Sequence, residues 1–275
     1  MSARAAAIGI DAGSTTCKAV AVDAQGSIIA RRLEPASPRI DQQAERMLLD
    51  LRREVGGDPP LGATGYGRKR VPGGRPVTEI SCHARGAFAL AGRPGLLVDM
   101  GGQDTKAIVI GGGGEVLDFA MNDKCAAGTG RFLANAAEVM GIRLDEVGPL
   151  SLQALQPVKI TTVCTVFVES DILSYLAQGK KGEDILGGVH QAIAKRTVSL
   201  ARRVPIEPAI TLTGGVARNI GMVRALEGVL GAQLQVSPDA HFIGAIGAAI
   251  FALEKLDRSF ESDIWSPEHA PHSGN

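Results

Sequence analysis

Residues 8–18 read Ile-Gly-Ile-Asp-Ala-Gly-Ser-Thr-Thr-Cys-Lys, and residues 96–106 read Leu-Leu-Val-Asp-Met-Gly-Gly-Gln-Asp-Thr-Lys. Each passage has an apolar run that predicts a buried strand, an aspartate where that strand ends, and a glycine turn that leads into a second strand. An aspartate, a glycine and a lysine recur in the same frame: Asp11 and Asp99, Gly13 and Gly101, Lys18 and Lys106. The gapless match continues to residues 29 and 117, which indicates an internal duplication.

The duplication predicts an α/β protein with two halves, residues 1–94 and 95–256, around a cleft. A strand is predicted at 61–64. Apolar residues at helical spacing predict the helices 42–55, 81–91, 132–140, 167–177, 184–203, 219–230 and 242–256. The segment 257–275 lacks this periodicity, and we expect it to be a mobile tail.

The composition is that of an ordinary water-soluble protein, with 45% apolar and 21% charged residues. Lys plus Arg and Asp plus Glu both number 29, so no excess charge points to nucleic acid or to a membrane surface. No stretch approaches the ~18 continuous apolar residues of a membrane span, and the N-terminus lacks the apolar run of a signal peptide. We therefore expect a cytoplasmic protein without a membrane or nucleic-acid partner.

The four cysteines lie far apart and form no C-x-x-C pair: Cys17, Cys82, Cys125 and Cys164. Without an export signal, disulfides are not expected, and metal or redox chemistry becomes the alternative. Cys17 falls in a predicted strand and Cys82 in a predicted helix, which indicates structural roles. Cys125 and Cys164 each precede a predicted helix, where the positive end of the helix favours a thiolate.

The paired turns predict a site for phosphate groups and a cation. Backbone amides, small side chains and a lysine are expected to hold the phosphates: Gly13, Ser14, Thr15, Thr16, Lys18, Gly101 and Gly102. Asp11 and Asp99, facing each other across the cleft, would hold Mg²⁺ through water molecules. Gln103 or Asp104 would orient a water at the terminal phosphate.

Two further glycine loops are candidates for the same site. Three residues lie just ahead of the helix 132–140, where backbone N–H groups can bind an anion: Gly128, Thr129 and Gly130. Taken alone, this loop is equally well explained as an ordinary turn with a small buried cysteine. The second loop follows a strand predicted at 209–212. Its residues Gly214, Gly215 and Val216 are expected to lie against an adenine or a ribose.

These features together resemble the ATPase superfamily of actin, the DnaK-type chaperones and the sugar kinases, which has a duplicated ribonuclease H-like fold. The likeness rests on both glycine turns, the loop 213–217 and the small-residue helix 244–249. Three passages resemble more specifically the activator ATPases of 2-hydroxyacyl-CoA dehydratases: 99–104, 121–132 and 161–170. The ATPase subunits of benzoyl-CoA reductase are relatives of these activators. The resemblance covers about residues 8–256.

The resemblance implies that Cys125 and Cys164 of each subunit bind one [4Fe–4S] cluster shared by a homodimer. Such a cluster takes four thiolates, which a two-fold axis would supply from two chains. Zinc would suit the same four thiolates, and only the family resemblance favours iron and sulfide.

The implied function is that of an ATP-hydrolysing electron donor. It would pass single electrons at low potential to an iron–sulfur dehydratase or reductase acting on an acyl-CoA, and would receive them from a ferredoxin or flavodoxin while ATP is converted to ADP. A benzoyl-CoA reductase ATPase subunit is the nearest alternative. A small-molecule kinase of the sugar or acetate type and a regulatory ATPase with a structural metal also stay open. His83 and His190 lie in helical patterns and are interpreted as surface or core histidines.

Overall fold

The structure is a computed structural model, and it describes residues 5–122, 128–160 and 165–258. Its first sheet has the strand order β3-β2-β1-β4-β5. These strands are β1 (Ala7–Ala12), β2 (Thr16–Val22), β3 (Ile28–Pro35), β4 (Leu61–Thr64) and β5 (Arg75–Pro76). β1 to β3 are antiparallel and β4 is parallel to β1. In this register Asp11 lies opposite Lys18 on one side and Thr64 on the other.

The second sheet repeats this topology, with the order β10-β9-β6-β7-β8. Its strands are β6 (Gly95–Met100), β7 (Thr105–Ile110), β8 (Val116–Asn122), β9 (Ile210–Thr213) and β10 (Leu234–Gln235). Asp99 lies opposite Lys106 and Thr213, as Asp11 lies opposite Lys18 and Thr64. The strand order and the register therefore confirm the predicted duplicated fold.

Eight α-helices are present in the described part of the chain. They are α1 (Ile40–Val55), α2 (Glu79–Ala91), α3 (Gly130–Met140), α4 (Leu144–Ser151), α5 (Thr165–Ala177), α6 (Gly182–Ala201), α7 (Ile220–Leu230) and α8 (Ile243–Arg258). Helix α2 begins earlier than predicted because the Thr78 side chain accepts a hydrogen bond from the Ser81 N–H and caps the helix. The pattern missed α4, which is short and contains Gly148 and Pro149.

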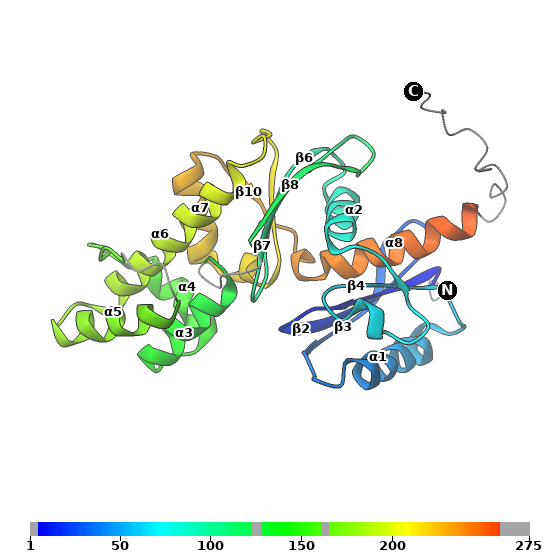
Figure 1. Cartoon of the computed structure of the whole chain (residues 1–275), viewed down its shortest axis with the longest axis horizontal. Helices are drawn as coiled ribbons and strands as arrows, with labels where there is room; N and C mark the ends of the chain where they lie inside the picture. The colour runs from blue at the N-terminus through cyan, green and yellow to red at the C-terminus, as the bar shows by residue number, and fades with distance from the viewer. Residues whose placement is uncertain (1–4, 123–127, 161–164, 259–275) are drawn as a thin grey trace, which may run out of the picture.

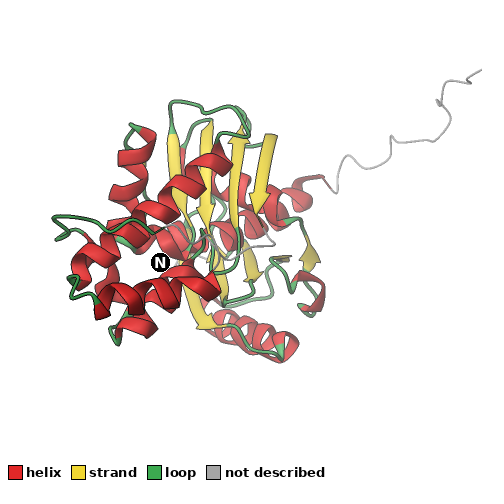
Figure 2. Ribbon diagram, turned by 60° about the vertical axis from the view of Figure 1, so that its left-hand side comes forward, coloured by secondary structure: helices red, strands yellow, loops and turns green. Residues whose placement is uncertain are grey.

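The helices and sheets form layers (Figures 1 and 2). Helix α1 packs on one face of the first sheet and α8 on the other. Helix α2 lies between α8 and the second sheet, against which it buries Ala84 and Ala87. Helices α3 to α7 lie beyond the second sheet and share its larger core. The two helices α2 and α8 therefore separate the two sheets.

Helix α8 does not lie in the half to which the sequence assigned it. The sequence places 242–256 with the second half, but in three dimensions α8 covers β1 and β4 of the first sheet. The contact is close because both strands carry a glycine: a Cβ at Gly9 would lie 1.9 Å from the Ala245 carbonyl oxygen, and one at Gly62 would lie 1.9 Å from that of Ala248. The first sheet is thus covered by the last helix that the structure describes.

The cysteines outside the predicted cluster loops are buried. Cys17 lies on β2 and Cys82 on α2, as predicted, and both are free thiols. Burial raises the pKa of each thiol to about 12, which makes both unreactive. Cys125 and Cys164 lie outside the described residues.

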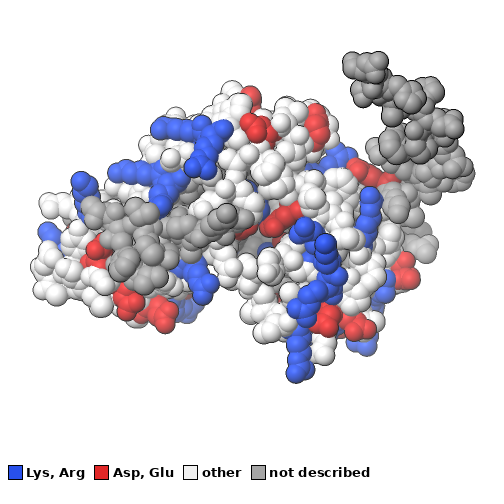
Figure 3. Space-filling model, viewed as in Figure 1, with Lys and Arg blue, Asp and Glu red and all other residues white. Residues whose placement is uncertain are grey.

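The surface carries both signs of charge on both lobes of the molecule (Figure 3). This distribution agrees with the equal numbers of basic and acidic residues. Among the described helices, none is long and apolar enough to cross a membrane.

Candidate active site

The site begins with two aspartates at the carboxyl ends of equivalent strands, Asp11 on β1 and Asp99 on β6. Each has a lysine from the neighbouring antiparallel strand. Lys18 Nζ lies 3.1 Å from Asp11 Oδ2, and Lys106 Nζ lies 3.3 Å from Asp99 Oδ2. Lys18, predicted to bind a phosphate, thus also forms an ion pair with a buried carboxylate.

Asp99 is fixed by contacts to both of its oxygens. The Thr213 hydroxyl donates to Oδ1 at 2.8 Å, and Lys106 lies beside Oδ2. Burial of Asp99 opposes its ionisation, but His83, Lys106 and the Thr213 hydrogen bond outweigh burial and hold the pKa of Asp99 well below its ordinary value. Asp99 is therefore a permanently charged, rigidly held carboxylate.

Lys106 joins three carboxylates although its side chain is only 1% exposed. Its Nζ lies 2.6 Å from Asp104 Oδ2, 3.0 Å from Glu79 Oε1 and 3.3 Å from Asp99 Oδ2. Burial opposes the charge of Lys106, but these three acids raise its pKa above the ordinary value. Asp104 is consequently engaged in an ion pair, whereas Gln103, the other candidate for orienting water, is exposed.

Asp11 differs from Asp99 in that one of its carboxylate oxygens is buried without a hydrogen bond. Its Oδ1 has no hydrogen-bond partner among the described residues. A buried carboxylate oxygen without a donor is costly unless a ligand or water supplies one, so Asp11 suits a hydrated cation. No group of three or more His, Cys, Asp or Glu side chains that could hold a metal ion is found in residues 5–122, 128–160 and 165–258.

The structure brings the two predicted phosphate turns together. We call residues 13–16 the first turn and residues 101–104 the second turn. A Cβ at Gly102 would lie only 2.2 Å from Thr15 Oγ1, so the second turn touches the first. Ser14 and Thr15 are exposed at this junction. The two predicted turns, one from each half, are therefore in contact with each other.

Helix α3 contacts the second turn directly, which changes the role expected for its first residues. Gly130 N–H donates to the Gly101 carbonyl at 2.9 Å, and Arg131 N–H donates to the Gly102 carbonyl at 3.0 Å. These amides are thus used within the protein and are not available to a phosphate. We therefore correct the expected role of Gly130: it anchors α3 to the second turn. Gly128 and Thr129 stay candidates, and Gly128 adopts a φ of 111° that favours glycine.

The loop after β9 lies against the end of β6 and the first residue of α3. Gly214 packs over the end of β6, where its Cβ would lie 2.2 Å from the Met100 carbonyl oxygen. A Cβ at Gly215 would lie 3.3 Å from His241 Nε2. The side chain of Val216 approaches Gly130 of α3. Burial, assisted by the nearby charges of Lys18 and Arg218, lowers the pKa of His241 to about 4. His241 is thus a neutral imidazole at the loop predicted to hold adenosine, a position the sequence did not point out.

Helix α2 contributes two residues that the sequence did not assign to the site. His83 Nδ1 lies 2.8 Å from the Glu79 carbonyl oxygen, and its Nε2 lies 3.5 Å from Asp99 Oδ2. Glu79 contacts Lys106. Both project from the same side of the helix, because they are four residues apart. That spacing in the segment Glu-Ile-Ser-Cys-His was the available signal. By contrast, His190 is a core histidine as predicted, bonded to Leu186 and Asn219.

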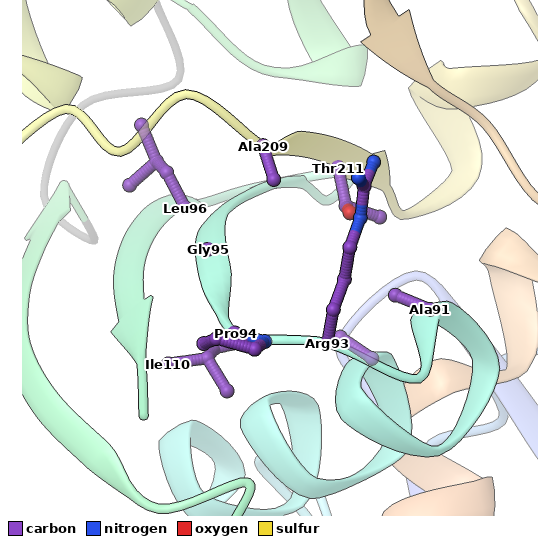
Figure 4. A pocket seen from close by; sticks show the side chains of 9 residues that line it. Ala91, Arg93, Pro94, Gly95, Leu96, Ile110, Ala209 and Thr211 are labelled. Atoms are coloured by element: carbon purple, nitrogen blue, oxygen red, sulfur yellow. The ribbon is translucent and has the colours of Figure 1, made fainter. Parts of the chain in front are cut away.

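A small pocket lies at the opposite end of the central strand β6 from Asp99 (Figure 4). It is lined by Ala87, Ala91, Arg93, Pro94, Gly95, Leu96, Ile110, Ala209 and Thr211. Its volume of about 10 Å³ is roughly that of one water molecule. Gly95 begins the strand that Asp99 ends, so this pocket is separated from the candidate site by about 13 Å of strand.

Comparison with known proteins identifies the family of the chain. The chain matches the model of the BadF/BadG/BcrA/BcrD ATPase family over residues 8–252. It is 41% identical over 257 residues to the activator of lactoyl-CoA dehydratase from Anaerotignum propionicum, with 91% of this chain and 98% of the relative covered. Component A of (R)-2-hydroxyglutaryl-CoA dehydratase from Acidaminococcus fermentans has a similar crystal structure, with a TM-score of 0.85, 36% identity and coverage of 91% and 98%.

A second solved relative was determined with a nucleotide analogue. The activator of 2-hydroxyisocaproyl-CoA dehydratase from Clostridium difficile with bound ADPNP has a TM-score of 0.84 and 34% identity, with 94% of this chain and 99% of the other covered. A ROK family glucokinase from Streptomyces griseus, at 16% identity and a TM-score of 0.59, shares the fold alone. These likenesses confirm both the predicted superfamily fold and the specific resemblance to dehydratase activators. The chain belongs to the BadF/BadG/BcrA/BcrD ATPase family.

Proposed function

We propose that this ATPase is an activator that couples ATP hydrolysis to single-electron transfer, with a 2-hydroxyacyl-CoA dehydratase or a related acyl-CoA reductase as the acceptor. The support comes from relatives that are named activators of such dehydratases and match nearly the whole chain. The acceptor would be an iron–sulfur protein, and a ferredoxin or flavodoxin would supply the electrons, as the family resemblance implies.

In this proposal ATP binds where the two halves meet. The first and second turns hold the phosphates, and Gly214, Gly215 and Val216 border the adenosine. Asp11 holds Mg²⁺ through waters, because its Oδ1 is buried and lacks a protein donor among the described residues. When bound, Mg²⁺ would neutralise the charge that develops on the transferred phosphoryl group. Gln103 is exposed beside this space and would orient the attacking water.

Cys125 and Cys164 are the proposed ligands of a [4Fe–4S] cluster, with two thiolates from each subunit of a homodimer. Both cysteines lie outside the described residues, so the support comes from the helices on their C-terminal side. Cys164 directly precedes α5, Cys125 precedes α3 by five residues, and α3 and α5 pack against each other. The two loops thus lead into neighbouring helices. A bound cluster would supply single-electron chemistry at low potential.

Direct hydrogen bonds join α3 to the second turn, and they are the main support for coupling. Two backbone N–H groups of α3, those of Gly130 and Arg131, donate to carbonyls of this turn. Cys125 lies only three residues ahead of Gly128. A rearrangement of the second turn on ATP hydrolysis must therefore displace the start of α3 or break these bonds. Either event would alter the surroundings of the Cys125 thiolate.

Iron release to a chelator tests the coupling. Anaerobically purified protein would be mixed with a chelator in the presence of ADP, of ATP or of neither. We expect the rates of iron release with ADP and with ATP to differ by about fivefold or more. If the bound nucleotide shifts the reduction potential of the cluster, oxidation or reduction of the cluster should shift nucleotide affinity by the equivalent factor, because the coupling is reciprocal in free energy. Equal rates and an unchanged reduction potential would contradict coupling, and colourless protein with ATPase activity would favour the kinase or regulatory alternatives.

A further inference from the structure

Gln43 is a buried polar side chain of α1 that the proposed function does not use. It is only 4% exposed. Its Oε1 accepts a hydrogen bond from the Ser37 N–H at 2.9 Å. Its Nε2 donates to the Pro35 carbonyl at 2.8 Å and to Glu34 Oε2 at 3.1 Å. Both donor hydrogens and the oxygen of the amide are therefore engaged, and all three bonds hold one segment, the end of β3 and the residues that follow it.

The segment that Gln43 holds is attached to the first turn. Ala36 directly follows Pro35, and its N–H donates to the Thr15 carbonyl at 2.9 Å. Strands β2 and β3 pair with Thr16 opposite Pro35, so Thr15 and Ala36 occupy the next position of the same ladder. Pro35 has no N–H group, so at this end of the ladder the donor is Ala36. Gln43 thus holds the segment that carries this donor.

The Ala36 bond fixes the first turn and leaves donors of the turn free. Because a peptide unit is planar, a fixed Thr15 carbonyl also fixes the peptide plane that follows Thr15. The N–H groups of Ser14 and Thr15 donate to no other residue in the described part of the chain. Successive free amides on an anchored turn are suited to bind an anion such as a phosphate group.

The second turn is held in a corresponding way. The carbonyls of Gly101 and Gly102 accept hydrogen bonds from Gly130 and Arg131, at the start of α3. In both halves, the chain that follows the third strand of the sheet donates to the glycine turn. The difference is that α3 donates from its own backbone, whereas α1 acts through one buried side chain, Gln43.

We propose that Gln43 is a positioning residue that, through the Ala36 N–H, holds the first turn in the shape that binds the phosphates of the nucleotide. The inference rests on the phosphate site of the proposed function. It gives a part in that site to α1, which packs on the face of the first sheet opposite to α8 (Figure 1). Loss of Gln43 should weaken the binding of phosphates and not that of adenosine, because the loop 214–216 belongs to the other half.

The test compares Gln43→Met with Gln42→Met. Methionine has a length similar to that of glutamine but lacks the amide, and Gln42 is an exposed neighbour on the same helix, which makes it the matched control. Dissociation constants for ADPNP and for adenosine, at one fixed concentration of Mg²⁺, would be measured by displacement of a fluorescent ADP analogue. Gln43→Met should bind ADPNP about five- to tenfold more weakly, the effect of one lost hydrogen bond, and adenosine within about twofold of wild type. Gln42→Met should match wild type with both ligands.

A second variant tests the path from Gln43 to the turn. Ala36→Pro removes the N–H that donates to the Thr15 carbonyl and leaves Gln43 in place, so it should produce the same selective loss of ADPNP affinity. If Gln43 acts through this bond, adding Gln43→Met to Ala36→Pro should weaken ADPNP binding by no more than about twofold further. Losses that multiply in the double variant would overturn this path.

The two ligands separate a failure of the inference from a failure of the proposed function. Wild-type protein that binds ADPNP no better than adenosine would remove the phosphate site, and the inference with it. If wild type prefers ADPNP and Gln43→Met keeps the full preference, only the role of Gln43 is overturned. Equal losses for ADPNP and adenosine would assign Gln43 a purely structural role and also overturn the proposal. Thermal unfolding of each variant shows that the comparison is made on folded protein.

Discussion

The buried hydroxyl of Thr105 donates a 2.7 Å hydrogen bond to the carbonyl of Gly128. Thr105 begins β7, directly after the second turn, and Gly128 lies just ahead of α3. This bond therefore joins the second turn to the loop that carries Cys125.

Replacing Thr105 by valine removes this donor and keeps the shape of the side chain. The Gly128 carbonyl would lose its partner, at a cost of about 1–3 kcal/mol. We expect iron release to depend less on whether ADP or ATP is bound, while ATP is still hydrolysed. Thr197→Val is the control, because that buried hydroxyl contacts Met100 Sδ at 4.0 Å rather than the Gly128 carbonyl. Full nucleotide dependence in Thr105→Val would contradict a path through this bond.

Iron content should separate the four cysteines into two pairs. Anaerobic wild-type protein is expected to contain about four irons and four sulfides per two chains. Cys125→Ala and Cys164→Ala should each lose the iron and the brown colour. Cys17→Ala and Cys82→Ala should keep both, because these thiols are buried in strand and helix. Four irons in each single chain would rule out a shared cluster.

The two aspartates should be needed for ATP turnover but not for the cluster. Asp11→Asn and Asp99→Asn keep the side-chain shape and remove the charge, and each should lower the rate of phosphate release roughly 100-fold. Iron content should not change. Asparagine is preferable to alanine at Asp99, because its amide oxygen can still face the buried Lys106, whereas truncation would remove that partner atom and destabilise the fold. Retained turnover in Asp11→Asn would remove Asp11 from the cation site.

Gln103 should act on the rate of hydrolysis rather than on binding. Gln103→Ala is expected to lower kcat for ATP by roughly tenfold with little change in KM, as for a group that acts in the transition state. Gln153→Ala, another exposed glutamine, provides the control for surface effects. If Gln103→Ala turned over normally, the water-orienting role would pass to Asp104, and the ion pair of Asp104 with Lys106 would have to open during the reaction.

Two glycine-to-alanine substitutions should have opposite effects on stability. At Gly247 in α8 a Cβ would lie 1.8 Å from the Cys82 carbonyl oxygen of α2, so Gly247→Ala should lower the free energy of unfolding by about 1–3 kcal/mol or more. At Gly228 in α7 nothing lies within 4 Å, and Gly228→Ala should raise the free energy of unfolding by about 0.5–1 kcal/mol. Urea denaturation measures both. A neutral Gly247→Ala would mean that α2 and α8 separate at little cost.

Much of the fold could be predicted because the sequence patterns that specify it involve neighbouring residues and occur twice in the chain. Asp11 and Asp99, with their glycines and lysines, fixed two strand pairs and revealed the duplication. The long helices followed from apolar spacing. Helix α4 could not be found in this way, since Gly148 and Pro149 weaken its pattern. The placement of α8 on the first sheet also escaped prediction, because it depends on a contact between residues more than 180 positions apart, such as Gly62 and Ala248.

Candidate site residues that directly follow a strand could be named from the sequence, whereas those that project from a helix were missed. Asp11, Asp99 and the glycine turns carry their signal in adjacent residues. The four-residue spacing of Glu79 and His83 was their only signal, and it could not show a role because their partners, Lys106 and Asp99, come from the other half. The use of Gly130 was predicted wrongly for a related reason. Whether its N–H group is free depends on a carbonyl of the second turn.

The position of α8 has a consequence for how the chain is made. The first sheet is translated early, but the helix that covers one of its faces is the last element that the structure describes. Until α8 emerges from the ribosome, Ala7 and Val20 have no partner layer on that face, although both are fully buried in the finished protein. Strands β6 to β9 can meanwhile assemble with helices α3 to α7, since the core that they share contains no residue of α8. N-terminal domains usually complete their folding first. Here we expect the opposite order, in which the half that is synthesised second completes its core before the half that is synthesised first.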